Sequence, residues 1–333
     1  MYFRASIIAT LSVAALATAA RAQTALSPPE AQNRLVEAAQ ARPPVIVGEF
    51  RVQGQRVYNA PVLAARRIVF EPGSSLLFSH QTLGLRRNAF VFAQEVASED
   101  PEKPGLIGWE KTTPNSPPPM GTAAAGADNG SREGASGGAG QNGRQGYIGQ
   151  TGDIGPDVTL VALKVSPTLK VDISGGPGGN GANGESGARG GGGGYGNPAS
   201  QNCCNCNRGA GDGSPGGPGG SGGPGGDGGT GGAGGTFTLV TPSEQVAVLT
   251  RVLQVNLAGG TPGLPGPGGK AGPGGGGGPG GQEARPWCRG NGNPGGSGAP
   301  GRDGGTGGAG AAGVAGTYFV GGLSPDDVGK LVQ

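Results

Sequence analysis

Glycine stands at every third position of GSPGGPGGSGGPGGDGGTGGAG, which occupies residues 213–234. The same spacing recurs in residues 134–155, 175–196, 260–281 and 292–316. A polyproline II helix has three residues per turn, so this spacing lines one side of the helix with glycine, where another backbone can approach closely. A flexible linker does not need glycine at a fixed interval of three residues. We therefore predict ordered polyproline II helices rather than disorder.

Two assemblies use a glycine stripe of this kind: a collagen triple helix of three chains, or a bundle in which one chain folds back on itself. Collagen favours proline and bulky residues at its two non-glycine positions. In residues 213–234 one of these positions is mostly a second glycine, which weakens a triple helix but gives a bundled helix two bare faces. We favour the single-chain bundle.

The order of the runs supports this choice. Residues 199–212 separate two runs of similar length, and residues 284–291 separate the next two. Equal arms around a non-periodic tip describe a long hairpin. Residues 134–316 resemble the glycine-rich polyproline II bundles of the snow-flea antifreeze protein and of the distal receptor-binding adhesin of some tailed phages. The resemblance implies that the tips or flat faces of the bundle do the binding.

The N-terminus has the parts of a secretory signal peptide. Arg4 precedes a short apolar run, and residues 20–22 form an A-x-A cleavage site. The run is shorter than the roughly 20 residues that a membrane-spanning helix needs. We expect removal of residues 1–22 and export to the periplasm or surface of a bacterial cell, without stable membrane insertion.

Composition limits the partners. Glycine supplies 78 of 333 residues and aromatic residues only 5%, which is too little large apolar material for one conventional core. The chain carries 24 basic and 22 acidic residues, and loss of residues 1–22 removes Arg4 and Arg21 and no acid. The mature chain is then formally neutral, so we do not expect a nucleic-acid partner, which needs a concentrated basic surface.

Short segments rich in β-branched residues flank the glycine runs and predict strands. The candidates are residues 158–165, 169–174, 236–240, 246–249, 253–257 and 317–320. These pieces repeat after about 80 residues, together with the glycine arms. In both copies a strand leads to a Thr/Ser-Pro-x-acid piece, residues 241–244 and 324–327, that predicts a helix start.

Upstream, the capping box Ser27-Pro28-Pro29-Glu30 predicts a short helix within residues 23–42. Strand candidates follow at residues 45–52, 67–78 and 89–93, and the strand, Glu-Pro-Gly turn, strand pattern of residues 67–78 resembles one coil of a parallel β-solenoid. We predict a mostly β and irregular fold with a short, parallel β-solenoid-like base and a projecting polyproline II bundle.

The expected division of the chain follows from these patterns. It comprises a signal peptide (1–22), a short helix (23–42), a β-rich base (43–100), an irregular proline- and glycine-rich arm (101–156) and two strand-plus-hairpin repeats (157–236 and 237–333).

The four cysteines lie in the two predicted tips: Cys203, Cys204 and Cys206 in the first and Cys288 in the second. In an exported protein we expect two disulfides, for which three pairings exist. A bond between the adjacent Cys203 and Cys204 would close a strained ring. We therefore expect Cys288 to bond one of the three and to tie the tips together. Zinc binding is the alternative, but Cys-Cys-Asn-Cys lacks the usual ligand spacing, and we expect no metal or cofactor.

Aromatic and basic residues accompany these cysteines, namely Tyr195, Arg208, Arg285, Trp287 and Arg289. Two roles fit Trp287. It can pack on the disulfides at a tip without another core, or it can form a ligand platform with the arginines, since binding hot spots are rich in Trp, Tyr and Arg.

Three functions remain open. The first is a non-enzymatic structural or adhesive surface protein whose tips bind a surface, a glycan or a protein partner, with self-association possible. The second is ice binding by a flat bundle face, which needs a regular outward run of Thr, Ala or Ser; Asn, Arg, Pro, Asp and Glu interrupt it here. The third is a carbohydrate-active β-solenoid enzyme, which needs a carboxylate pair in a cleft. His80 is the only histidine and no motif pairs it with a nucleophile, so we expect the first function and no catalytic residue.

Overall fold

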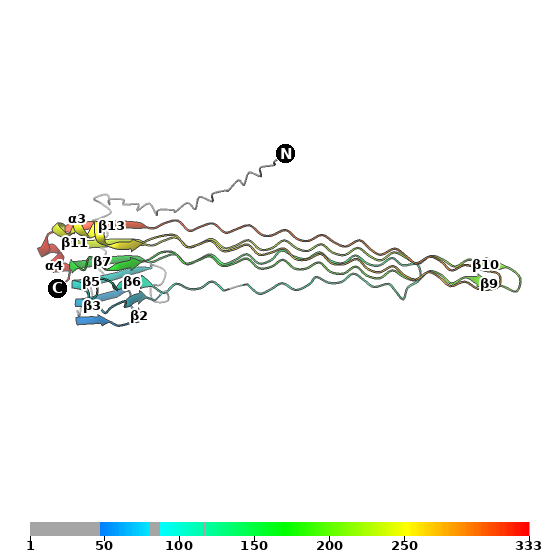
Figure 1. Cartoon of the computed structure of the whole chain (residues 1–333), viewed down its shortest axis with the longest axis horizontal. Helices are drawn as coiled ribbons and strands as arrows, with labels where there is room; N and C mark the ends of the chain where they lie inside the picture. The colour runs from blue at the N-terminus through cyan, green and yellow to red at the C-terminus, as the bar shows by residue number, and fades with distance from the viewer. Residues whose placement is uncertain (1–46, 80–86, 116, 333) are drawn as a thin grey trace, which may run out of the picture.

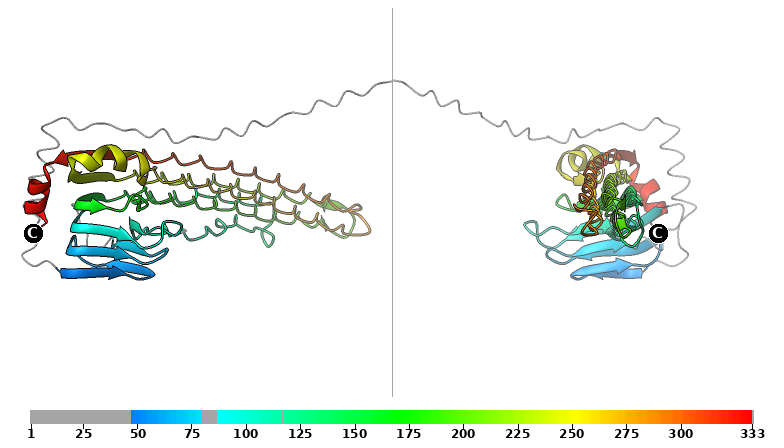
Figure 2. Two further views of the ribbon diagram at one scale, coloured as in Figure 1. Left: turned by 60° about the vertical axis from the view of Figure 1, so that its left-hand side comes forward. Right: turned by 90° about the vertical axis from the view of Figure 1, so that its right-hand side faces the viewer.

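A computed structural model describes residues 47–79, 87–115 and 117–332. A block of strands forms one end of the molecule, and a long, narrow bundle of extended arms projects from it (Figures 1 and 2). The fold is mostly β and irregular, as predicted. The signal peptide and helix predicted in residues 1–42, and His80, lie outside the described residues.

The base contains two parallel sheets that the chain visits alternately. One has the order β1-β3-β5-β7-β11-β13 and the other the order β12-β8-β6-β4-β2. The strands of the first sheet are Val47–Val52, Val62–Phe70, Asn88–Ser98, Asp157–Val165, Thr236–Pro242 and Thr317–Leu323. Those of the second, from β2 to β12, are Gln55–Tyr58, Ser75–Phe78, Leu106–Trp109, Lys170–Asp172 and Gln254–Asn256. This alternation confirms the solenoid-like base.

Large apolar side chains fill the space between the two sheets. Phe70, Phe78, Ile107, Leu160 and Phe237 are fully buried there. A smaller cluster on the outer face of the first sheet packs around Val328 and Val332 of helix α4 (Pro325–Leu331) and its C-cap. Apolar residues are therefore concentrated in the base, which explains how a glycine-rich chain acquires a core at all.

Two details of the base differ from the sequence prediction. Residues 106–109 were predicted to lie in an irregular arm, but they form strand β6 between β4 and β8. Residues 246–249 were predicted as a strand, but they lie within helix α3 (Ser243–Val252). The helix start predicted at residues 324–327 is confirmed, because the Ser324 side chain accepts a hydrogen bond from the Asp327 N–H at the start of α4.

The projecting bundle is made of polyproline II arms inserted between strands of the base. We name them arm A (110–115 and 117–133), arm B (134–156), arm C (174–199), arm D (209–235), arm E (257–283) and arm F (291–316). Arms A and B join β6 to β7, arms C and D join β8 to β11, and arms E and F join β12 to β13. The predicted hairpins, C with D and E with F, are present.

The arms form two layers, A-C-E and B-D-F. Within a layer, Gly178 N donates to Thr261 O (arms C and E) and Gly219 N to Ala299 O (arms D and F), each at 2.8 Å. Between layers, bonds link consecutive arms. Gly220 N, for example, donates to Ala188 O at 2.8 Å. Each arm therefore hydrogen-bonds to the next arm along the chain and to the one after it. A polyproline II helix cannot pair its backbone N–H and C=O groups internally, and these contacts supply the partners.

Arm D, inside the bundle, needs glycine on two faces, and the outer arm F needs it on one. In arm D, a Cβ atom on Gly219 would stand 2.0 Å from Gly272 O in arm E, and a Cβ on Gly220 would stand 1.9 Å from Gln141 O in arm B. In the outer arm F, a Cβ on Gly304 would stand 2.0 Å from Gly223 O, but Gly305 has open space. From Gly217 to Gly235, the second glycine of the arm D triplets is thus required by its position inside the bundle.

Asparagine and aspartate on the outward side of the arms also have structural partners. Asp212 and Asp227 of arm D accept from Asn293 N and Gly308 N of arm F at 2.7 and 2.6 Å. The partner lies 81 residues further along the chain in both pairs, in line with the repeat predicted from sequence. These side chains hydrogen-bond N–H groups of the neighbouring arm that would otherwise face water.

Tyr318 of β13 is expected to make the stability of the base fall at alkaline pH. Its ring stacks on Phe237 with centroids 5.5 Å apart, and its hydroxyl is buried without a hydrogen-bond partner in the described structure. Burial raises the pKa of Tyr318 to about 12 from 10.0. Below pH 10 the hydroxyl is neutral in both states. Between about pH 10 and 12 it ionises in the unfolded chain first, so stability falls as the pH rises.

Replacement of Tyr318 by phenylalanine is expected to raise the free energy of unfolding at pH 8 by about 1 kcal/mol, since an unpaired buried hydroxyl is removed. It should also abolish about 2 kcal/mol of the alkaline loss, because each pKa unit corresponds to about 1.4 kcal/mol. Urea titrations at pH 8 and pH 11.5 measure both effects. Tyr147→Phe, whose ring is 56% exposed, is the matched control and should change neither. An unchanged alkaline loss in Tyr318→Phe would refute the assignment.

Candidate functional site at the tip of the bundle

Two turns close the far end of the bundle. The first lies between β9 (Ser200–Gln201) and β10 (Cys206–Arg208), which pair antiparallel. The Asn202 side chain stabilises it by accepting from Asn205 N at 2.8 Å and from Cys204 N at 3.2 Å. This turn is visible at the right-hand end of Figure 1.

The second turn joins arms E and F. Ala284 and Cys288 exchange backbone hydrogen bonds of 2.9 and 2.8 Å across it. The Glu283 carboxylate accepts from Gly290 N at 2.9 Å and pairs with the Arg285 guanidinium. The Gly290 bond, followed by that from Arg285, holds the pKa of Glu283 below its usual value. Glu283 thus keeps its charge and fixes both ends of the turn.

A disulfide between Cys206 and Cys288 joins the two turns, with the Cα atoms 4.9 Å apart. The predicted bond from Cys288 to the first tip is therefore present. The prediction of two disulfides is wrong, because Cys203 and Cys204 are free and exposed. Cys206 lies on β10 facing the second turn, whereas Cys203 and Cys204 lie in the outer loop beyond the strand ends.

Gln201 forms a second connection between the turns. Its amide oxygen accepts from Trp287 N at 2.9 Å, and its amide nitrogen donates to Arg285 O. Sequence reasoning missed this residue, because nothing in the local pattern marks an amide that bridges two turns distant in the chain. Gln201 and the disulfide together hold the backbone of residues 285–288 in place.

The structure brings most of the predicted tip residues together. Arg285, Trp287 and Arg289 lie in the second turn, where the Trp287 side chain is 51% exposed. Arg208 extends from β10 and donates to Pro198 O at 3.2 Å. Tyr195 lies on arm C five residues before β9, roughly 15 Å down the arm at about 3.1 Å per residue, where its carbonyl accepts from Gly134 N. The structure therefore separates Tyr195 from the tip cluster.

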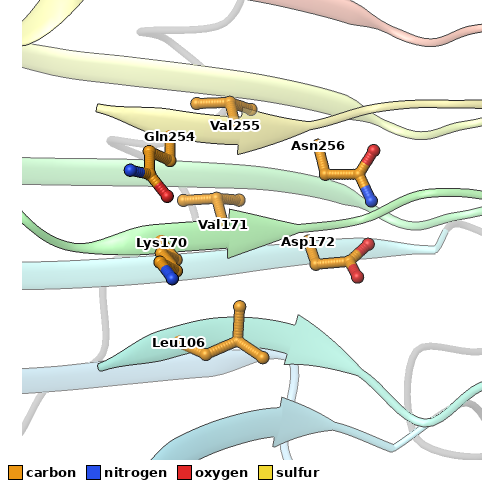
Figure 3. A pocket seen from close by; sticks show the side chains of 7 residues that line it. All are labelled: Leu106, Lys170, Val171, Asp172, Gln254, Val255 and Asn256. Atoms are coloured by element: carbon orange, nitrogen blue, oxygen red, sulfur yellow. The ribbon is translucent and has the colours of Figure 1, made fainter. Parts of the chain in front are cut away.

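A shallow hollow of about 450 Å³ lies on the outer face of the second sheet (Figure 3). It is lined by Leu106, Lys170, Val171, Asp172, Gln254, Val255 and Asn256. Figure 3 shows the Lys170, Asp172, Gln254 and Asn256 side chains on neighbouring strands. The lining contains a single carboxylate.

That carboxylate, Asp172, is fully engaged. Burial opposes its ionisation, but hydrogen bonds from Ser174 N and Oγ and the charge of Lys111, 3.2 Å away, outweigh this effect and lower its pKa. Lys111 also donates to Ser174 Oγ at 2.6 Å. Hydrolysis of a glycosidic bond ordinarily requires two carboxyl groups, one of them protonated. Asp172 is ionised, and the hollow offers no second carboxyl group among its lining residues.

Within the described parts of the chain, no cluster of three or more His, Cys, Asp or Glu side chains is arranged to hold a metal ion. The helices described there are also too short or too polar to cross a bilayer.

No protein-family model matches the chain, and no curated protein matches it. Among solved structures, a springtail antifreeze protein from Granisotoma rainieri, a bundle of nine polyproline type II helices, is 25% identical. The match covers 51% of this chain and 98% of that chain, with a TM-score of 0.13. A score this low carries no argument, so the functional proposal rests on the geometry of the tip.

Proposed function

We propose that this chain is an exported, non-enzymatic adhesive or structural protein that uses a stiff polyproline II bundle to present its disulfide-tied tip to a surface, glycan or protein partner. The observation that carries the proposal is Trp287. Half of this large side chain is open to solvent, while its backbone is held by Gln201 and by the neighbouring disulfide. An exposed anchor on a fixed backbone loses little conformational freedom on binding.

The surroundings of Trp287 suit recognition. Arg285 and Arg289 flank it in the same turn, and Arg285 remains 77% exposed despite its pairing with Glu283. Tryptophan and arginine are enriched at binding hot spots. The arms raise this cluster above the base by about 75 Å, the length of 24 residues at about 3.1 Å each. Such a reach suits contact with a separate surface better than a role in the base.

The two alternative functions, ice binding by a bundle face and carbohydrate cleavage on the base, have less support. The outward positions expected to order ice carry Asp212 and Asp227, which bond to the neighbouring arm. The hollow on the base offers Asp172, whose carboxylate is already engaged by Lys111 and Ser174.

The test is binding of the purified chain to a glycan array and to immobilised cell-surface preparations, with variants measured alongside. Trp287→Ala is expected to weaken binding at least tenfold, which corresponds to about 1.4 kcal/mol. Leu264→Ala is the control, because Leu264 is also an exposed apolar residue (67%), but on the side of the bundle. Binding that is insensitive to Trp287→Ala but reduced by changes on the bundle faces would overturn the proposal.

A further inference from the structure

The loop between β9 and β10 carries two free thiols at the outermost part of the bundle. Cys203 and Cys204 are both exposed, and their sulfur atoms lie 3.1 Å apart. The loop is ordered by the Asn202 side chain and by the bond from Asn202 N to Asn205 O at 3.0 Å. The thiols are thus presented in a fixed place, away from every other cysteine that could pair with them.

Bonding between these two thiols within one chain is disfavoured. Adjacent Cα atoms across a trans peptide are about 3.8 Å apart, whereas disulfides usually join Cα atoms separated by about 4.4–6.8 Å. The remaining cysteines, Cys206 and Cys288, are already bonded to each other. A metal is not indicated either, since the described residues supply no third ligand at this site. The remaining source of a partner sulfur is another molecule.

We infer that Cys203 and Cys204 are the site of a covalent, tip-to-tip dimer of this chain. Two thiols side by side are self-complementary under twofold symmetry, because Cys203 of one copy meets Cys204 of the second copy and the reverse contact follows. Tip-to-tip contact also places the two bases at opposite ends, where they cannot collide (Figure 1). A partner with a single thiol would leave one of the two cysteines unused.

The bonds form by thiol–disulfide exchange with a small disulfide such as glutathione disulfide. The Cys203 thiolate attacks it, forms a mixed disulfide and releases one glutathione thiolate. The Cys204 thiolate of the second copy then attacks the Cys203 sulfur and releases the other. Two interchain bonds therefore consume two glutathione disulfides and yield four glutathione thiols. Because the Cys204 thiol donates to the Cys203 sulfur, its pKa is raised, and coupling should accelerate as the pH rises toward 9.

The charge of the tip predicts how the rate of coupling depends on salt. Arg208, Arg285 and Arg289 outnumber Glu283 in the two turns, so two approaching tips repel each other. Salt screens exposed charges over about 8 Å at physiological ionic strength. The rate of coupling should rise severalfold between low and high salt.

The experiment uses the full mature chain, mildly reduced so that Cys206–Cys288 survives and then incubated with reduced and oxidised glutathione. We expect a species of twice the monomer mass on a non-reducing gel. Peptide mapping should link Cys203 to Cys204 of the other copy, and small-angle scattering should show a nearly doubled maximum dimension. Cys203→Ser with Cys204→Ser should abolish the dimer. Neither single variant alone should dimerise efficiently, because its remaining cysteine faces a serine, but an equal mixture of Cys203→Ser and Cys204→Ser chains should give a singly bonded dimer.

Several outcomes would overturn the inference. These are a monomer with an intrachain Cys203–Cys204 bond, a monomer carrying only glutathione, a dimer in which the two bundles lie side by side, or dimer formation at the same rate in denaturing urea. The inference does not depend on the proposed binding function. Trp287→Ala should therefore dimerise like the parent chain even where it abolishes binding.

Discussion

Replacing Gly304 by alanine is expected to lower the free energy of unfolding by about 3 kcal/mol, whereas replacing its neighbour Gly305 should leave it unchanged or raise it by about 0.5 kcal/mol. A Cβ atom on Gly304 would stand 2.0 Å from the carbonyl oxygen of Gly223 in arm D, but one on Gly305 would meet nothing within 4 Å. The obstacle at Gly304 is backbone, which has no rotamer to change, so arms D and F must move apart.

Urea titration measures the loss, and hydrogen exchange locates it. The amides of Gly301, Gly304 and Gly307 donate to arm E at 2.9 Å each and should exchange faster in Gly304→Ala only. A loss of about 3 kcal/mol should also lower the melting temperature by roughly 4–5 °C in a protein of this size, since the unfolding entropy is about 2.1 cal/mol/K per residue.

A second adjacent pair repeats the comparison on another arm. A Cβ on Gly275 of arm E would stand 1.9 Å from Gly191 O, while Gly276 has open space. Gly275→Ala should therefore destabilise the chain, and Gly276→Ala should not. Equal stabilities within either pair would contradict the packing of the bundle.

Removing the Cys206–Cys288 disulfide is expected to cost about 4 kcal/mol. The bond joins residues separated by 82 positions in the sequence, and a loop of that size restricts the unfolded chain by about this amount in the chain-entropy description. Cys288 is also 3% exposed, so serine in its place buries a hydroxyl. The Cys206→Ser, Cys288→Ser double variant should unfold at lower urea and with a larger m-value, because its unfolded state is less compact.

The chain contains a matched control for this experiment. Cys203→Ser with Cys204→Ser removes the same number of sulfur atoms from the same tip but no cross-link, and should change stability by less than about 0.5 kcal/mol. Hydrogen exchange at the amides of Ala284 and of position 288 should increase only in the variant that lacks the cross-link. Equal stabilities of the two double variants under oxidising conditions would show that the cross-link contributes nothing.

Particular elements show where sequence reasoning worked and where it failed. The helix start at residues 324–327 was predicted because serine, proline and aspartate there act on their own backbone, which is a local effect. Strand β6 was missed because Leu-Ile-Gly-Trp is too short to show alternation, and it becomes a strand by pairing with β4 and β8. In residues 246–249 the local pattern favoured a strand, but they continue α3, whose Leu249 is buried in the core between the sheets.

At the tip, too, the local features were predicted and the long-range contacts were not. The sequence placed four cysteines and an aromatic, basic cluster at the ends of equal arms, since arm length follows from counting triplets. It could not choose Cys206 from the three candidates, because that choice depends on which residue β10 turns toward the second tip. It also could not find Gln201, whose two bonds cross to a segment 84 and 86 residues away.

The glycine phase by itself determined that this chain forms polyproline II arms, because three residues per turn is a property of the backbone alone. It also indicated that arm D has two bare faces, since glycine fills the second position of most of its triplets. Only the tertiary structure decided which arms lie inside, which carbonyl each glycine N–H meets, and which cysteines remain free. Those outcomes depend on how distant segments align, and the base fixes that alignment by stacking its strands in register.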